Sequence, residues 1–214
     1  MLPQGRIDLQ GHSKVETAEK PQETKSSTET PKHVPPKPTP PKPASKPEPE
    51  LPAFEKSIAD KIIEKFGDKT SISFVKPDRV GIKVGRDHIH DVAQFARDIL
   101  KFDHVDSVAG VDYPQDKEIE VVYHLSSYTE PTLSRQILEL ATRAQREENP
   151  IPGQDATRLP SLRDIFYSVE FHEREVFEML GVYFEGHPDN RRLLLPEDWA
   201  DLPPLRKDFR NKGR

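Results

Sequence analysis

Residues that commonly bind metals or transfer protons gather in one amphipathic segment, where His172, Glu173 and Glu175 lie close together. His172 and Glu175, three positions apart, would share one face of a helix, and that spacing can supply half of a two-metal carboxylate site. A zinc-protease helix needs a second histidine four positions on, where this chain has Val176. The second half of either site is missing, so the segment predicts no metal centre.

Opposite charges in the same segment favour an ordinary stable helix. Glu170 and Arg174 stand four positions apart, as do Arg174 and Glu178. We expect each pair to meet across one turn and to contribute about 0.2–0.5 kcal/mol. Gly181 follows the last apolar residue of the segment and predicts the end of a helix over residues 170–180.

Another histidine, His187, lies in the turn that follows. Gly186 permits backbone angles that other residues avoid, and Pro188 fixes one backbone angle. We expect a rigid turn that aims the side chains of Asp189, Arg191 and Arg192. A catalytic pair of His187 and Asp189 is the alternative, but no nucleophile precedes it at a recognisable spacing.

Apolar periodicity predicts the elements that must position these residues. Helical spacing favours helices over residues 53–66, 88–102 and 170–180. Alternating, β-branched segments predict strands at 71–75, 80–84, 104–113 and 119–125, and the first two form a hairpin.

Other segments are less regular. Residues 133–147 suit a helix by composition, and they also suit a further strand of the sheet. Residues 149–160 contain three prolines and a glycine and predict a loop, followed by a short turn of helix at 162–166. The order of elements predicts an α+β domain, with a mostly antiparallel sheet and helices packed on one face.

Composition divides the 214 residues into three parts. Residues 1–52 hold few large apolar side chains and a dense proline tract, and we expect a disordered extension. Its role is left open between a solubilising tail and a docking segment for a partner. Residues 53–200 form the α+β domain, and residues 201–214 are expected to be an extended basic tail.

Several functional classes are excluded by composition. The chain has no cysteine, so it offers no disulfide, thiolate zinc site or iron–sulfur ligands of its own. No apolar run approaches a membrane span, and the N-terminus lacks the apolar core of a signal peptide. We therefore expect a soluble protein that reaches a membrane only through partners. A net charge of −5 argues against general nucleic-acid binding.

Residues 161–208 resemble the signature region of the 30-kDa-type subunit, also called the C subunit, of the proton-pumping NADH:quinone oxidoreductases of respiratory complex I. Residues 54–126 follow that family's order of elements less specifically. The matching motif positions are Glu173, Arg174, Glu175, Gly181, Phe184, Gly186, His187, Pro188, Asp189, Arg191, Arg192, Pro196, Trp199, Arg206 and Lys207.

The resemblance implies a non-catalytic structural subunit in the peripheral arm of a membrane-bound oxidoreductase, at the cytoplasmic face of the cell membrane. Its partners would be the quinone-site, D-like subunit and the iron–sulfur subunits. No cofactor would bind this chain, because flavin, iron–sulfur clusters, quinone and NAD(H) or F420 would be held elsewhere in the complex. The motif positions would then be interface and structural residues.

Departures from the family pattern leave the electron donor open between NADH, reduced F420 and ferredoxin. Asn190 stands where the family usually has leucine, and Phe171 where it usually has tryptophan. The alternatives to the main hypothesis are a subunit of a membrane-bound hydrogenase-type complex and an adaptor that recruits a partner through its proline tract. A standalone metallohydrolase using His172, Glu175 and His187 is a further alternative.

Overall fold

The computed structural model describes residues 52–148 and 157–210. The predicted disorder of the proline-rich extension concerns residues 1–51, which lie outside the described part, and so do residues 149–156 of the predicted loop.

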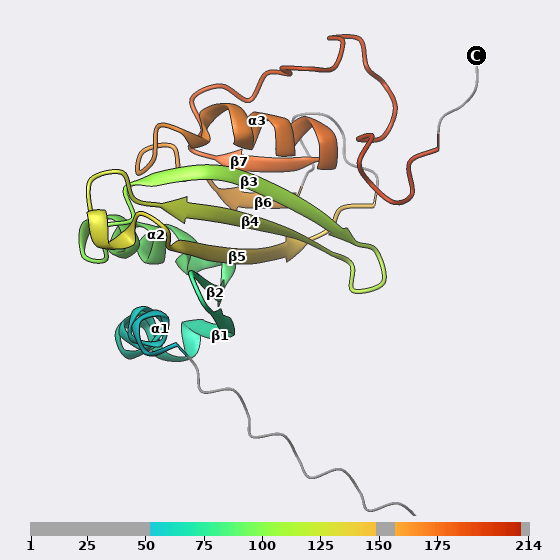
Figure 1. The fold of residues 1–214 in the computed structure, drawn as a ribbon. Coiled ribbons are helices and arrows are strands. Elements are labelled where there is room, and N and C mark those ends of the chain that lie inside the picture. Colours follow the sequence, from blue (N-terminus) through green and yellow to red (C-terminus); the bar gives the residue numbers. More distant parts are fainter. Residues whose placement is uncertain (1–51, 149–156, 211–214) are drawn as a thin grey trace, which may run out of the picture. The chain divides into compact units, whose positions relative to one another are not determined.

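A five-stranded sheet forms the centre of the domain (Figure 1). Its strand order is β1-β2-β5-β4-β3, in which β2 and β5 are parallel and all other neighbours are antiparallel. The predicted α+β class with a mostly antiparallel sheet is confirmed. The strands are β1 Thr70–Lys76, β2 Arg79–Val84, β3 His104–Tyr113, β4 Glu118–Ser126 and β5 Ile137–Gln145.

Strand β5 settles the ambiguity of residues 133–147. Along it, Leu138, Leu140, Thr142 and Ala144 are buried, and the residues between them are more exposed. This period of two is that of a strand with one covered face. The helical appearance of the segment came from its leucine, alanine, glutamate and arginine, whose propensities are overridden by burial between β2 and β4.

Three α-helices accompany the sheet in the described part: α1 Ala53–Phe66, α2 Ile89–Asp98 and α3 Val169–Leu180. Tyr123 of β4 donates its hydroxyl hydrogen to Glu173 of α3, which places α3 on the Tyr123 face of the sheet. Register puts Leu140 and Ile82 on the same face, and all three side chains are fully buried. The hydrophobic core therefore lies between this face and the helices.

Helix α2 is shorter than the predicted helix over residues 88–102. It ends at Asp98, and Lys101 adopts a left-handed conformation with φ of 67°. The N–H of Phe102 then donates to the carbonyl of Ala96, which turns Leu100 and Phe102 into the core. The apolar pattern continued past the helix because the turn residues are also buried.

Two further strands, β6 Thr157–Pro160 and β7 Val182–Glu185, pair in parallel on either side of α3 in the sequence. The prediction of a loop through Pro160 is therefore wrong for its last four residues. Residues 162–166 form a turn in which the N–H of Phe166 donates to the carbonyl of Leu162. The predicted stop of α3 is confirmed, since Gly181 is left-handed with φ of 82°.

Helix α3 rests directly on the backbone of β3 at Gly110. A methyl group added there would lie 2.1 Å from Cδ1 of Leu180. We expect Gly110→Ala to lower the free energy of unfolding by about 1–3 kcal/mol through overpacking. Chemical denaturation measures the loss. Gly85→Ala is the matched control, because its added methyl would meet no atom closer than 3.6 Å. Equal stabilities of the two variants would contradict close packing of α3 on β3.

Candidate functional site

Glu173 is buried beneath α3 and holds three parts of the fold together. Its carboxylate accepts hydrogen bonds from the Tyr123 hydroxyl at 3.1 Å, the Ser161 hydroxyl at 2.5 Å and the Leu162 N–H at 2.9 Å. Burial raises the pKa of Glu173 to about 7, although these hydrogen bonds act in the opposite direction. The glutamate therefore joins α3 to β4 and to the segment after β6.

The buried His187 fixes the turn that follows β7. Its Nδ1 accepts the N–H of Asp189 at 3.0 Å, so we assign the ring proton to Nε2, which donates to the carbonyl of Glu170 at 3.1 Å. The carboxylate of Asp189 bonds instead to Arg191. The alternative of a catalytic pair between the side chains of His187 and Asp189 is therefore wrong, and the histidine braces the turn.

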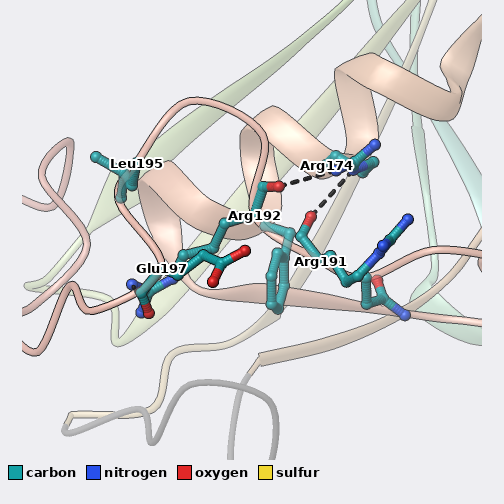
Figure 2. Close-up of a pocket in the computed structure, with 7 residues that line it drawn as sticks. Arg174, Arg191, Arg192, Leu195 and Glu197 are labelled. Carbon is teal, nitrogen blue, oxygen red and sulfur yellow. Dashed lines mark hydrogen bonds between the residues drawn. The ribbon is translucent and has the colours of Figure 1, made fainter.

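Arg174 reaches from α3 to the loop beyond this turn (Figure 2). Its Nε donates to the carbonyl of Arg191 at 3.0 Å, and its Nη2 donates to the carbonyl of Arg192 at 2.9 Å. Its Nη1 lies 3.5 Å from a carboxylate oxygen of Asp189. One guanidinium thus holds three nearby loop positions.

Glu178, one turn further along α3, holds the next part of the same loop. Its carboxylate accepts the N–H groups of Leu193, Leu194 and Leu195 at 3.0, 2.8 and 3.0 Å. Consecutive N–H groups that converge on one anion form a compact nest in the backbone. The leucine triplet is therefore fixed from below by a single buried carboxylate.

These contacts correct the predicted charge pairs along α3. Glu170 bonds to Arg163 rather than to Arg174, with a distance of 2.6 Å between the two side chains. Arg174 and Glu178 bond to backbone groups of the loop. Arg174 makes two hydrogen bonds to the loop backbone and Glu178 makes three, so polar groups of that backbone obtain the partners they need.

The neighbouring side chains of Arg191 and Arg192 have different surroundings. The side chain of Arg192 folds back on its own loop, where its Nη1 donates to the carbonyl of Pro196 at 2.8 Å and its Nη2 to that of Trp199 at 2.6 Å. The guanidinium of Arg192 therefore closes its own loop. The side chain of Arg191, by contrast, is 86% exposed.

The loop that is fixed by these charges displays apolar side chains. Leu193 is 41% exposed and Leu194 is 60% exposed, and Phe171 on α3 is also exposed. The side chains of Arg174, Glu178 and Arg192 thus bond to backbone groups of the loop, and the apolar residues beside them are exposed.

A second charged cluster anchors the C-terminal segment. Asp112 of β3 accepts hydrogen bonds from Nε of Arg146 at 2.7 Å and from the N–H of Lys207 at 2.9 Å. Arg146 also pairs with Asp208 at 2.8 Å. Arg206 is buried and donates to the carbonyl of Glu147 at 2.6 Å. Arg206 is therefore a buried structural residue within the segment that was expected to be an extended basic tail.

Residues 201–210 contain no helix or strand, as expected of an extended tail, but turns return them to the domain. The N–H of Arg206 donates to the carbonyl of Pro203, and that of Phe209 to the carbonyl of Arg206. The N–H of Leu205 donates to the carbonyl of Met179 at the end of α3. The boundary between the domain and the tail at residue 200 stays a prediction from the sequence composition.

The sequence of this chain matches a known protein family. Residues 82–214 match the family described as "Respiratory-chain NADH dehydrogenase, 30 Kd subunit". The chain belongs to this family. Membership makes it one subunit of a multi-subunit respiratory complex, as the resemblance of the motif implied.

Individual relatives extend the picture. The chain is 34% identical over 155 residues to the C subunit of the F(420)H(2) dehydrogenase of Methanosarcina mazei, covering 72% of this chain and 90% of that protein. It is 37% identical over 128 residues to the C/D subunit of the NADH-quinone oxidoreductase of Phocaeicola vulgatus, covering 60% of this chain and 22% of that protein. A chain of the membrane-bound sulfane sulfur reductase, an archaeal respiratory membrane complex, matches with a TM-score of 0.60 and 27% identity, covering 73% of this chain and 86% of that chain.

The remaining motif positions of this 30-kDa-type protein have varied structural settings. Phe184 of β7 is fully buried, Glu175 and Pro188 are exposed, and Gly186 is left-handed with φ of 85°. Trp199 donates its indole N–H to the carbonyl of Leu202 at 3.2 Å.

The two departures from the family pattern also have places in the fold. Asn190 donates its side-chain amide to the carbonyl of Phe184 at 3.3 Å, so it helps to close the turn. Phe171 is exposed on α3, with the Arg174 guanidinium 5.9 Å from its ring centre.

The residues proposed for a metallohydrolase do not converge. Across residues 52–148 and 157–210, no group of three or more His, Cys, Asp or Glu could hold a metal ion. Over the same two stretches, no helix is long and apolar enough to cross a membrane.

Sequence reasoning missed Tyr123, Ser161, Asp112 and Arg146 as partners of the motif residues. A signal was present for Asp112, because alternation along β3 places it on the covered face, where a carboxylate needs a partner.

Proposed function

We propose that the chain is a non-catalytic structural subunit in the peripheral arm of a membrane-bound quinone oxidoreductase supplied by NADH or by reduced F420. Its relatives include proteins named for both kinds of dehydrogenase, and a related chain belongs to a respiratory membrane complex. Flavin, iron–sulfur clusters and quinone are held by its partners. The complex places the chain at the cytoplasmic face of the membrane.

One observation carries this proposal: charged side chains of α3 bond to the backbone of the following loop, while leucine side chains of that loop stay exposed. Arg174 and Glu178 hold the backbone of residues 191–195 from inside, and Leu193 and Leu194 are left exposed. An exposed leucine on a backbone that is already ordered loses little entropy on binding, which favours a role in docking.

The quinone-site subunit is the partner that the relatives favour. The name of the Phocaeicola vulgatus protein joins the letters C and D, and the matched part is 22% of its length. Two subunit-like parts that are joined in one polypeptide stay close together in space, which supports a D-like subunit beside this chain. We therefore assign the exposed loop at 186–199 to that interface.

Leu194→Asp is expected to weaken association with the D-like subunit strongly while leaving the lone chain nearly as stable. A desolvated apolar anchor contributes about 2 kcal/mol or more to an interface. An exposed position in the free chain changes stability by about 0.5 kcal/mol or less. Native pulldown of the tagged full chain from solubilised membranes measures association, and thermal unfolding measures stability.

Ile99→Asp is the matched control, since Ile99 is 62% exposed and Leu194 is 60% exposed. Ile99 lies just after α2, outside the motif. Normal recovery of the D-like subunit with both variants would place the interface elsewhere. The proteins that co-purify with the wild-type chain also identify the donor, since a flavin-bearing NADH module, an F420 module or a hydrogenase-like module would each be recognised by mass spectrometry.

A further inference from the structure

A groove of about 610 Å³ lies beside α3 and the loop that Arg174 holds (Figure 2). Phe177 and Leu195 contribute apolar atoms to its lining. Its charged lining comprises three guanidinium groups and one carboxylate, those of Arg174, Arg191, Arg192 and Glu197. Cationic groups beside apolar atoms suit an acidic peptide better than a purely apolar one.

Arg191 differs from Arg174 and Arg192 because part of its guanidinium makes no hydrogen bond within the described residues. Arg174 and Arg192 donate to backbone carbonyl groups of the loop. Arg191 uses one side of its guanidinium to bind Asp189. Its Nε donates to Oδ1 of Asp189 at 2.9 Å, and its Nη2 donates to Oδ2 at 2.9 Å. Its Nη1 has no hydrogen-bond partner within the described ranges 52–148 and 157–210.

The pairing with Asp189 also orients this free end. Asp189 accepts the backbone N–H of Arg191 at 3.0 Å as well as the side-chain bonds. The guanidinium lowers the pKa of Asp189 well below its usual range, so the pair stays charged at neutral pH. A guanidinium that is held in place before binding loses less freedom when a second carboxylate meets its Nη1 and Nη2 edge.

We propose that the groove binds a carboxylate-bearing segment of the neighbouring subunit, with the Nη1 and Nη2 edge of Arg191 as the recognition element. The proposal rests on the proposed function only for the presence of a neighbouring subunit at this loop. The acidic side chain pairs end-on with Arg191, and its apolar neighbours contact Phe177 and Leu195. The planar fork of arginine matches the two oxygens of a carboxylate, whereas a lysine offers a single charged point.

Zero-length crosslinking in the intact membrane complex tests the identity of the occupant. The double variant Asp189→Asn/Arg191→Lys places a primary amine in the groove and removes the nearest internal carboxylate. Treatment with a carbodiimide should then join position 191 to an Asp or Glu of the neighbouring subunit, and peptide mass mapping would identify it. A link confined to Glu197, or no link at position 191 in a complex of normal composition, would overturn the proposal.

Pulldown of single variants separates this proposal from the proposed function. We expect Arg191→Glu to weaken association with the D-like subunit about tenfold or more, because like charges then face each other. Arg191→Lys should lose less, since it keeps the charge and loses the fork. Wild-type association of Arg191→Glu alongside loss of association in Leu194→Asp would refute the groove proposal and leave the docking role intact. Failure of the wild-type chain to recover any respiratory subunit would instead refute the docking role.

Discussion

Replacing Asp112 with alanine is expected to lower the free energy of unfolding by about 3–5 kcal/mol, the cost of breaking a buried ion pair from one side. The side chain of Asp112 is 1% exposed and accepts both Nε of Arg146 and the N–H of Lys207. Its removal leaves the buried guanidinium of Arg146 with Asp208, which lies much closer to solvent. The C-terminal segment loses a backbone anchor in the same step.

Urea denaturation of the purified chain measures the effect of Asp112→Ala. Glu118→Ala is the control, because Glu118 also pairs with an arginine, Arg143 at 3.1 Å, but is far more exposed. That pair should contribute about 1 kcal/mol or less. Hydrogen exchange at Lys207 should also accelerate in Asp112→Ala. Similar losses in both variants would mean that the Asp112 cluster is as well solvated as an ordinary surface pair.

Glu173→Gln is expected to remove a pH dependence of stability that the wild-type chain shows between about pH 4.5 and 7. Burial raises the folded-state pKa of Glu173 from 4.5 to about 7. In this window the unfolded chain has lost the proton and the folded chain still holds it, so wild-type stability falls as the pH rises. This pKa shift corresponds to a loss of about 3 kcal/mol in the free energy of unfolding between pH 4.5 and 7.

Chemical denaturation of the wild type and of Glu173→Gln at pH 5, 6 and 7 tests the direction of this pH dependence. The wild type should gain stability relative to Glu173→Gln as the pH falls, because the glutamine cannot take up the proton. The acids whose pKa values are lowered, such as Asp189 and Asp208, titrate below this window. Glu170→Gln is the control, a partly exposed carboxyl paired with Arg163. Parallel stability curves for wild type and Glu173→Gln would mean that Glu173 is already ionised in the folded state at pH 5.

Local patterns predicted those features whose causes are local. The first helix ends at Gly67 and α3 at Gly181, as the glycines indicated, and the β1–β2 hairpin has its predicted position. Strand β5 depends on neighbours far away in the sequence, so its helix-favouring composition misrepresented it. The parallel pairing of β2 and β5 left no signal in either segment.

The motif shows the same limit for side chains. Spacing along α3 indicated pairs between Glu170, Arg174 and Glu178, but the sequence does not reveal that a loop will bring unpaired carbonyl and N–H groups to them. Burial of Glu173 was equally hidden, because its partners come from β4 and from the segment after β6. Which residues belong to the motif was visible in the sequence, and what each of them bonds to was not.

The central position of β5 has a consequence for synthesis on the ribosome. The β1–β2 and β3–β4 hairpins emerge first, but within the sheet they are joined only through β5, which begins at Ile137. Until that strand is translated, the nascent chain holds two separate hairpins, each with an open edge able to pair with another chain. A message truncated before Ile137 would therefore yield two unjoined halves rather than a smaller sheet.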